Sequence, residues 1–121
     1  MDSNDAIIRR FCTVAFKRMN ADELIEYFSP DALYHNIPLP PLRRTAEIYA
    51  SLKELPQRFD GLEVEILNQI AVGDLVMNER IDYFLRGGRR TALPIAGVFQ
   101  MEAGKIKVWG EYFDLETFRN G

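Results

Sequence analysis

The sequence has almost none of the residues that build disulfide frameworks and common metal sites. One cysteine and one histidine occur in 121 residues. An internal disulfide is therefore excluded, and a zinc site is not expected, because zinc sites take three or four ligands drawn mostly from these two types. Cys12 falls on an apolar helical stripe, and no histidine is near it in the sequence. We interpret it as a core thiol and not as a nucleophile.

Long apolar runs and a strong excess of one charge are also missing. No run approaches the roughly 20 apolar residues of a membrane-spanning helix, and residues 1–5 are polar and acidic where a secretory signal would be basic and then apolar. The formal net charge is −3, and the basic segments Arg43-Arg44 and Arg86 to Arg90 are short, so we interpret them as solvated turns. We expect a cytoplasmic protein without a nucleic-acid or membrane partner.

The first half of the chain has the apolar spacing of helices. Apolar residues recur every three or four positions, and polar capping patterns separate the periodic stretches. We expect a first helix with an N-cap at Asn4 and an apolar stripe of Ile7, Ile8, Phe11, Cys12, Ala15 and Met19. A short second helix begins at the capping-box pair Asn20 and Glu23. An extended segment over residues 32–37 follows, and then a helix from Thr45 to Leu55 that Pro56 closes.

From Gly61 the apolar period changes to two, which is typical of strands. The expected strands run from Gly61 to the Gly73-Asp74 turn, and over Leu75–Arg86, Arg89–Met101 and Ile106–Phe113. Helices followed by strands in tight hairpins predict an α+β fold, with a curved antiparallel or mixed sheet packed on N-terminal helices. A chain of 121 residues is long enough for one core and too short for two, so we expect a single domain over residues 1–121.

A row of polar side chains interrupts the second of these strands. Asn78, Arg80 and Asp82 alternate along it, so their side chains share one face of the sheet. Burial of such a row is costly unless its members satisfy one another, which indicates either a structural ion-pair network or an active site. If the Gly87-Gly88 and Ala103-Gly104 loops have two residues each, Asp82 lies opposite Leu93 and Leu93 opposite Asp114. Two carboxylates would then stand about 10 Å apart with Arg80 close to both.

Further residues favour an active site on this face. Tyr34 and Asn36 share one face of the extended segment by the same spacing, whereas His35 points the other way. Structural explanations exist for each group alone: an ion pair for Arg80 and Asp82, an N-cap of a terminal turn for Asp114, and packing or turn roles for Tyr34 and Asn36. Their convergence on one apolar concavity favours function. We expect its apolar wall to comprise Phe16, Leu55, Phe59, Phe84, Leu93 and Ile95.

Four motifs together resemble the limonene-1,2-epoxide hydrolase family. They are Tyr34-x-Asn36-x-Pro38, Asn78-Glu79-Arg80-x-Asp82, the segment Leu93 to Phe99, and Trp109-x-x-Tyr112-Phe113-Asp114. The resemblance spans almost the whole chain and implies the cone-shaped fold shared with nuclear transport factor 2, ketosteroid isomerase and polyketide cyclases. Two features depart from the pattern. The chain starts directly at the first helix, and Gly110-Glu111 stands where a larger basic residue and an aspartate are expected.

The resemblance implies an epoxide hydrolase that adds water to an apolar epoxide and gives a vicinal diol. By similarity, Asp114 is the base, Asp82 is the acid, Arg80 bridges them, and Tyr34 and Asn36 hold the water; no metal or organic cofactor is required. One rival is an isomerase-like proton shuttle, with one aspartate as base and Tyr34 as oxyanion donor. Another is a non-catalytic ligand-binding or dimerisation module. A dehydratase or cyclase would be expected to use histidine, which the orientation of His35 disfavours.

The opposite face of the strands carries apolar side chains. We expect this face to be covered in a homodimer, because a soluble monomer rarely leaves so large an apolar patch in water. The expected patch consists of Met77, Ile81, Tyr83, Val98, Trp109 and Phe113.

Overall fold

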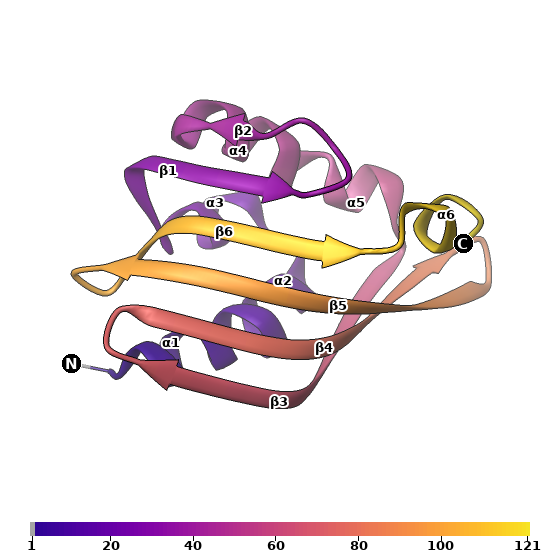
Figure 1. Cartoon of the computed structure of the whole chain (residues 1–121). Coiled ribbons are helices and arrows are strands. Elements are labelled where there is room, and N and C mark those ends of the chain that lie inside the picture. The colour runs from indigo at the N-terminus through magenta and orange to yellow at the C-terminus, as the bar shows by residue number, and fades with distance from the viewer. Residues whose placement is uncertain (1) are drawn as a thin grey trace.

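The sheet of this protein carries its helices on one face (Figure 1). A computed structural model describes residues 2–121. The strands follow the order β2-β1-β6-β5-β4-β3, and β1 runs parallel to β6 while every other neighbouring pair is antiparallel. The α+β architecture with a mixed sheet is confirmed. The strands are β1 (Phe28–Asn36), β2 (Leu42–Arg43), β3 (Gly61–Val72), β4 (Leu75–Arg86), β5 (Arg89–Glu102) and β6 (Lys105–Phe113).

The N-cap of the first helical segment lies one residue before the expected one. The segment comprises α1 (Asn4–Arg10), one π-helical turn η1 (Phe11–Ala15) and α2 (Phe16–Arg18). Ser3 is the N-cap, because its backbone is still extended and its side chain accepts from the Ala6 amide at 3.1 Å. The expectation for Asn4 was wrong: Asn4 is already helical and donates to the Gly73 carbonyl instead. Asn20 caps α3 (Ala21–Ile25) through the amides of Asp22 and Glu23, as predicted.

The third expected helix is divided in two. Helix α4 (Arg44–Lys53) has its N-cap at Arg43, so Thr45 lies inside the first turn and is not the cap. Pro56 does not close this helix. It lies in the first turn of α5 (Leu55–Arg58), where a helix leaves its N–H groups without partners and tolerates proline. In the part of the chain that the structure describes, no helix is long and apolar enough to span a membrane.

Phe11 is the centre of the core between the helices and the sheet. Its side chain is fully buried, and its ring contacts five other aromatic rings, at centroid distances from 5.0 Å for Trp109 to 6.2 Å for Phe99. Trp109 and Phe99 come from β6 and β5. The packing therefore fixes which face of those strands looks toward the helices.

The hairpin between β4 and β5 has the predicted register, whereas the next hairpin does not. Asp82 pairs with Leu93 and Arg80 with Ile95, as expected. Between β5 and β6, Met101 pairs with Ile106 but Gln100 pairs with Val108, so Lys107 is an extra, bulged residue. A shift of one residue turns every later side chain to the other face of the sheet.

The bulge at Lys107 overturns two expectations. Glu111 lies opposite Gly97 and is the carboxylate of β6 on the helix-covered face, whereas the predicted register put Asp114 on that face, opposite Leu93. Asp114 instead lies beyond the end of β6 and is the N-cap of α6 (Leu115–Arg119). Trp109, 2% exposed, and Phe113 also face the helix side, so they do not belong to the outer apolar patch.

Candidate active site

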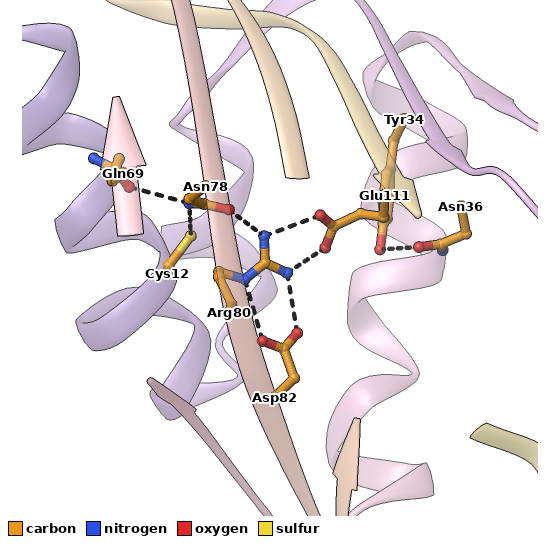
Figure 2. A network of polar contacts seen from close by, with 8 residues as sticks. All are labelled: Cys12, Tyr34, Asn36, Gln69, Asn78, Arg80, Asp82 and Glu111. Carbon is orange, nitrogen blue, oxygen red and sulfur yellow. Dashed lines mark hydrogen bonds and ion pairs between the residues drawn. The ribbon is translucent and has the colours of Figure 1, made fainter. Parts of the chain in front are cut away.

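A single guanidinium group joins two carboxylates on the helix-covered face of the sheet (Figure 2). Arg80 is 2% exposed, and its Nε and Nη2 donate to the Asp82 carboxylate at 3.2 and 3.1 Å. Its Nη1 and Nη2 donate to the Glu111 carboxylate at 3.0 and 2.6 Å. The fifth hydrogen bond is donated by Nη1 to Asn78 Oδ1 at 3.0 Å. All five N–H groups of a guanidinium are thereby satisfied.

Glu111 is the second carboxylate bound to Arg80, the role for which Asp114 was expected. The carboxylate of Asp114 is exposed and accepts from the backbone N–H and the hydroxyl of Thr117, at 2.9 and 2.6 Å. These hydrogen bonds lower the pKa of Asp114. The structural explanation, an N-cap for the terminal turn, is therefore the correct one for this residue. The departure at Gly110-Glu111 was the sequence signal for Glu111, since Trp109 and Glu111 alternate onto one face.

Tyr34 and Asn36 enter the site from β1, which lies beside β6. Asn36 is in register with Glu111, and the Tyr34 hydroxyl donates to Asn36 Oδ1 at 3.2 Å. The Tyr34 ring stacks on Trp109 with centroids 4.1 Å apart, which fixes the direction of the hydroxyl. His35 points elsewhere, as predicted, with Nε2 2.9 Å from the Leu39 carbonyl oxygen.

These polar groups open into an apolar pocket of about 120 Å³. Asp82, Glu111, Tyr34 and Asn36 all contribute to its wall. The structure places the six expected apolar residues, Phe16, Leu55, Phe59, Phe84, Leu93 and Ile95, on the same wall. The sequence did not predict Phe113 and Phe118 in this wall. Phe113 was assigned to the other face because the bulge was not foreseen, and no local pattern places the terminal helix, with Phe118, over the pocket.

Burial sets the protonation behaviour of the site. Burial raises the pKa of Glu111 above its usual value, although the positive charge of Arg80 opposes the change. The pKa of Arg80 lies well above its usual value, because attraction to Glu111 and Asp82 outweighs the effect of burial. Burial also raises the pKa of the Tyr34 hydroxyl, so it stays a hydrogen-bond donor at neutral pH. The site therefore combines a permanent cation, Arg80, with a buried carboxyl, Glu111, whose neutral form is favoured by burial.

The remaining candidates for chemistry do not face the pocket. Cys12 is 3% exposed, and burial raises the pKa of its thiol to about 12, so it stays protonated. Asn78 donates to Cys12 Sγ at 3.8 Å and to Gln69 Oε1 at 3.0 Å, which connects Arg80 to β3 and the first helical segment. Over residues 2–121 no three histidine, cysteine, aspartate or glutamate side chains are arranged to hold a metal ion.

Comparison with known proteins assigns the family. The family described as "Limonene-1,2-epoxide hydrolase catalytic domain" matches residues 3–120. The chain belongs to this family. Among hydrolases of similar sequence, epoxide hydrolase EphG of Mycobacterium tuberculosis (strain ATCC 25618 / H37Rv) is 29% identical over 107 residues, which are 88% of this chain and 71% of that protein.

Solved structures agree with this family and fold. A limonene-epoxide-hydrolase-like (LEH-like) epoxide hydrolase from M. tuberculosis superimposes with a TM-score of 0.84 at 26% identity, covering 97% of this chain and 86% of that one. An NTF2-like protein of unknown function from Burkholderia pseudomallei K96243 gives a TM-score of 0.83 at 19% identity, with 98% and 97% coverage. The cone-shaped fold expected for the hydrolase family is confirmed.

Gly97 leaves the space that the network around Arg80 occupies. A Cβ atom at this position would lie 2.5 Å from Arg80 Nη1 and 2.8 Å from both Asn78 Oδ1 and Glu111 Oε2. All three side chains are buried, and Arg80 Nη1 donates a hydrogen bond to each of the two oxygens. None of these atoms can move aside without breaking the network.

The substitution Gly97→Ala is therefore expected to destabilise the protein by about 1–3 kcal/mol, the usual cost of an overpacked core position. Urea unfolding measures the change. Gly61→Ala is the matched control in a strand, because its Cβ would meet Leu85 Cδ1 at an ordinary 3.5 Å. Equal unfolding midpoints for the two variants would show that the site does not depend on the close approach at Gly97.

Proposed function

We propose that the chain is an epoxide hydrolase that adds water directly to an apolar epoxide and forms a vicinal diol, with no metal or organic cofactor. The observation that supports this most strongly is the joining of Asp82 and Glu111 by Arg80 at the wall of one apolar pocket. Opening an epoxide in one step needs a base that activates water and an acid that protonates the departing oxygen. Two carboxyls held apart by one guanidinium supply both.

Glu111 is the proposed base because of its neighbours. Asn36 lies beside it in the β1–β6 pair, and the Tyr34 hydroxyl adjoins Asn36. An amide and a hydroxyl offer the donors and acceptors that hold a water molecule against a carboxylate. The raised pKa of Glu111 makes its carboxylate a better proton acceptor than an exposed glutamate.

Asp82 is the proposed acid on the other side of Arg80. In the reaction, the water oxygen forms a bond to one epoxide carbon while Glu111 takes a proton from that water. The bond between this carbon and the epoxide oxygen breaks, and the oxygen takes the proton of Asp82. The products are the diol, neutral Glu111 and ionised Asp82, so the cycle closes when one proton returns from Glu111 to Asp82. The cycle requires that the two carboxyls together hold one proton, as in other enzymes with paired carboxyls.

The isomerase-like alternative explains fewer of these contacts. A proton shuttle with Tyr34 as oxyanion donor needs one carboxylate, and it gives no role to an arginine that binds two. The Tyr34 hydroxyl also donates to Asn36 and not toward the apolar end of the pocket. A non-catalytic module would function without either carboxylate, so substitution of these groups distinguishes it from a hydrolase.

We expect Asp82→Asn and Glu111→Gln each to lower kcat for epoxide hydrolysis by about 10²–10⁴-fold, the usual contribution of a general acid or base. Both substitutions keep the side-chain shape and remove the proton transfer. Asp114→Asn is the control and should keep normal turnover, since asparagine caps a helix as well as aspartate does. Turnover of a panel of cyclic and terminal epoxides gives the rates, and circular dichroism checks folding. Near-normal rates for folded Glu111→Gln, or a dead Asp114→Asn, would overturn the assignment of the base.

We also propose a homodimer joined through the outer face of the sheet. The structure supports a corrected patch, without Trp109 and Phe113, in which Met77 is 49% and Tyr112 51% exposed. Its other members by register are Ile81, Tyr83, Pro94, Ala96 and Val98. An apolar surface of this kind on a monomer indicates an interaction site.

Light scattering at micromolar concentration should report twice the 14.0 kDa mass of the chain. Met77→Arg should produce monomers, because Met77 is 49% exposed on this face between Ile70 and Val98, and the new charge would be buried in the interface. A monomeric parent protein would rule the dimer out.

A further inference from the structure

A second, larger pocket adjoins the catalytic one and is basic. It has a volume of about 300 Å³ and shares four lining residues with the catalytic pocket: Arg58, Phe59, Phe84 and Phe118. Among the described residues, no aspartate or glutamate lines it. Four arginines do: Arg58, Arg86, Arg89 and Arg119.

Strand β4 runs from the catalytic acid to this basic pocket. Arg80, Asp82, Phe84 and Arg86 alternate along it and share one face. Arg86 is four positions after Asp82, which corresponds to about 13 Å along the strand. The wall between them is aromatic, because the Phe84 ring packs against Phe59 and Phe118 at 4.8 and 5.7 Å between centroids. A ligand that touches both ends therefore has an apolar middle section.

Three of the four arginines have no carboxylate partner within the described chain. Arg58 pairs with Glu54 at 2.8 Å, but no ion pair within 4.0 Å among residues 2–121 includes Arg86, Arg89 or Arg119. The nearby Asp60 carboxylate is occupied by the Gly87 amide at 2.9 Å. A shallower neighbouring hollow, which Arg89 also lines, contains Asp114 and Glu116, yet neither forms an ion pair with it.

Arg86 and Arg89 place two positive charges side by side at the exposed end of this pocket. The two residues are directly opposite in the β4–β5 ladder, and like charges in such a pair destabilise a sheet. Both side chains lie on the pocket face, since Asp82–Leu93 and Phe84–Thr91 are the preceding pairs in the same ladder. Residues 86–90 are all exposed at the Gly87-Gly88 turn, as predicted, but Arg86 and Arg89 also line this pocket, whereas Arg90 does not.

We propose that Arg86, Arg89 and Arg119 bind a carboxylate at the far end of the substrate, so that the preferred substrate is the epoxide of a medium-chain unsaturated carboxylic acid. This inference rests on the proposed function for the chemistry at Asp82 and Glu111. Planar guanidinium groups bind carboxylates through paired hydrogen bonds. The aromatic wall takes the alkyl chain, and the spacing along β4 places the epoxide at the acid while the carboxylate is at the arginines.

The test compares the terminal epoxide of undecenoic acid with the primary amide of the same epoxide, which has the same shape and no charge. The parent enzyme should hydrolyse the acid with the higher kcat/KM. The double variant Arg86→Gln/Arg89→Gln should lose about tenfold in kcat/KM for the acid, since exposed charge pairs contribute modestly, and little for the amide. Arg90→Gln is the matched control. Its guanidinium lies on the outer face, 3.8 Å from the Tyr83 ring centroid, and pairs with Glu63.

Binding of undecanoate and undecanamide by calorimetry separates this inference from the proposed function, because neither compound has an epoxide. Tighter binding of undecanoate that is lost in Arg86→Gln/Arg89→Gln and kept in Arg90→Gln supports the carboxylate site, even if no epoxide is hydrolysed. In that case only the hydrolase assignment fails. Equal binding of the acid and the amide, with epoxides still hydrolysed, would overturn the carboxylate site and leave the hydrolase intact.

Discussion

The burial of the Arg80 guanidinium is the constraint on which the rest of the site depends. A buried cation is tolerated only when opposite charges and hydrogen-bond acceptors surround it, and removal of one partner from such a pair typically costs about 3–5 kcal/mol. Here Asp82, Glu111 and Asn78 accept all five of its N–H groups. The same contacts that make Arg80 tolerable also hold two carboxyls side by side at the wall of a pocket.

The partners of Arg80 come from different strands, so the site and the sheet stabilise each other. Asn78 and Asp82 precede and follow it on β4, Glu111 comes from β6, and Gly97 of β5 leaves the gap that the guanidinium crosses. Gln69 of β3 and Cys12 of the first helical segment hold Asn78 in turn. Because the network joins three strands and a helix across a fourth strand, it positions the acid and the base more rigidly than loops would.

The sequence predicts the structure correctly where local periodicity determines it. Spacing alone predicts the first two helical segments, the positions of the three hairpins, the row Asn78-Arg80-Asp82 and the shared face of Tyr34 and Asn36. The two-residue Gly87-Gly88 loop also predicts the correct β4–β5 register. The bulge at Lys107 does not follow from spacing. It is decided by tertiary packing, because only the shifted register buries Trp109 against Phe11.

That one residue accounts for the main errors at the site. Because of the bulge, the second carboxylate of the site is Glu111 and not the predicted Asp114. Trp109 and Phe113, which were predicted on the outer patch, lie on the inner face. The position of the N-cap at Ser3 and not Asn4 has a similar cause, since Asn4 bonds to Gly73 in a distant turn. Local sequence patterns do not predict long-range contacts of this kind.

The central claim is that Asp82 and Glu111 transfer protons and that water itself attacks the epoxide carbon. A single turnover in heavy-oxygen water, with enzyme in excess over epoxide, tests it most directly. The proposed mechanism predicts that the new hydroxyl of the diol carries the heavy oxygen, that the attacked carbon is inverted, and that both carboxylates remain unlabelled by peptide mass spectrometry. An unlabelled diol together with heavy oxygen in Asp82 or Glu111 would show a covalent ester intermediate and contradict it.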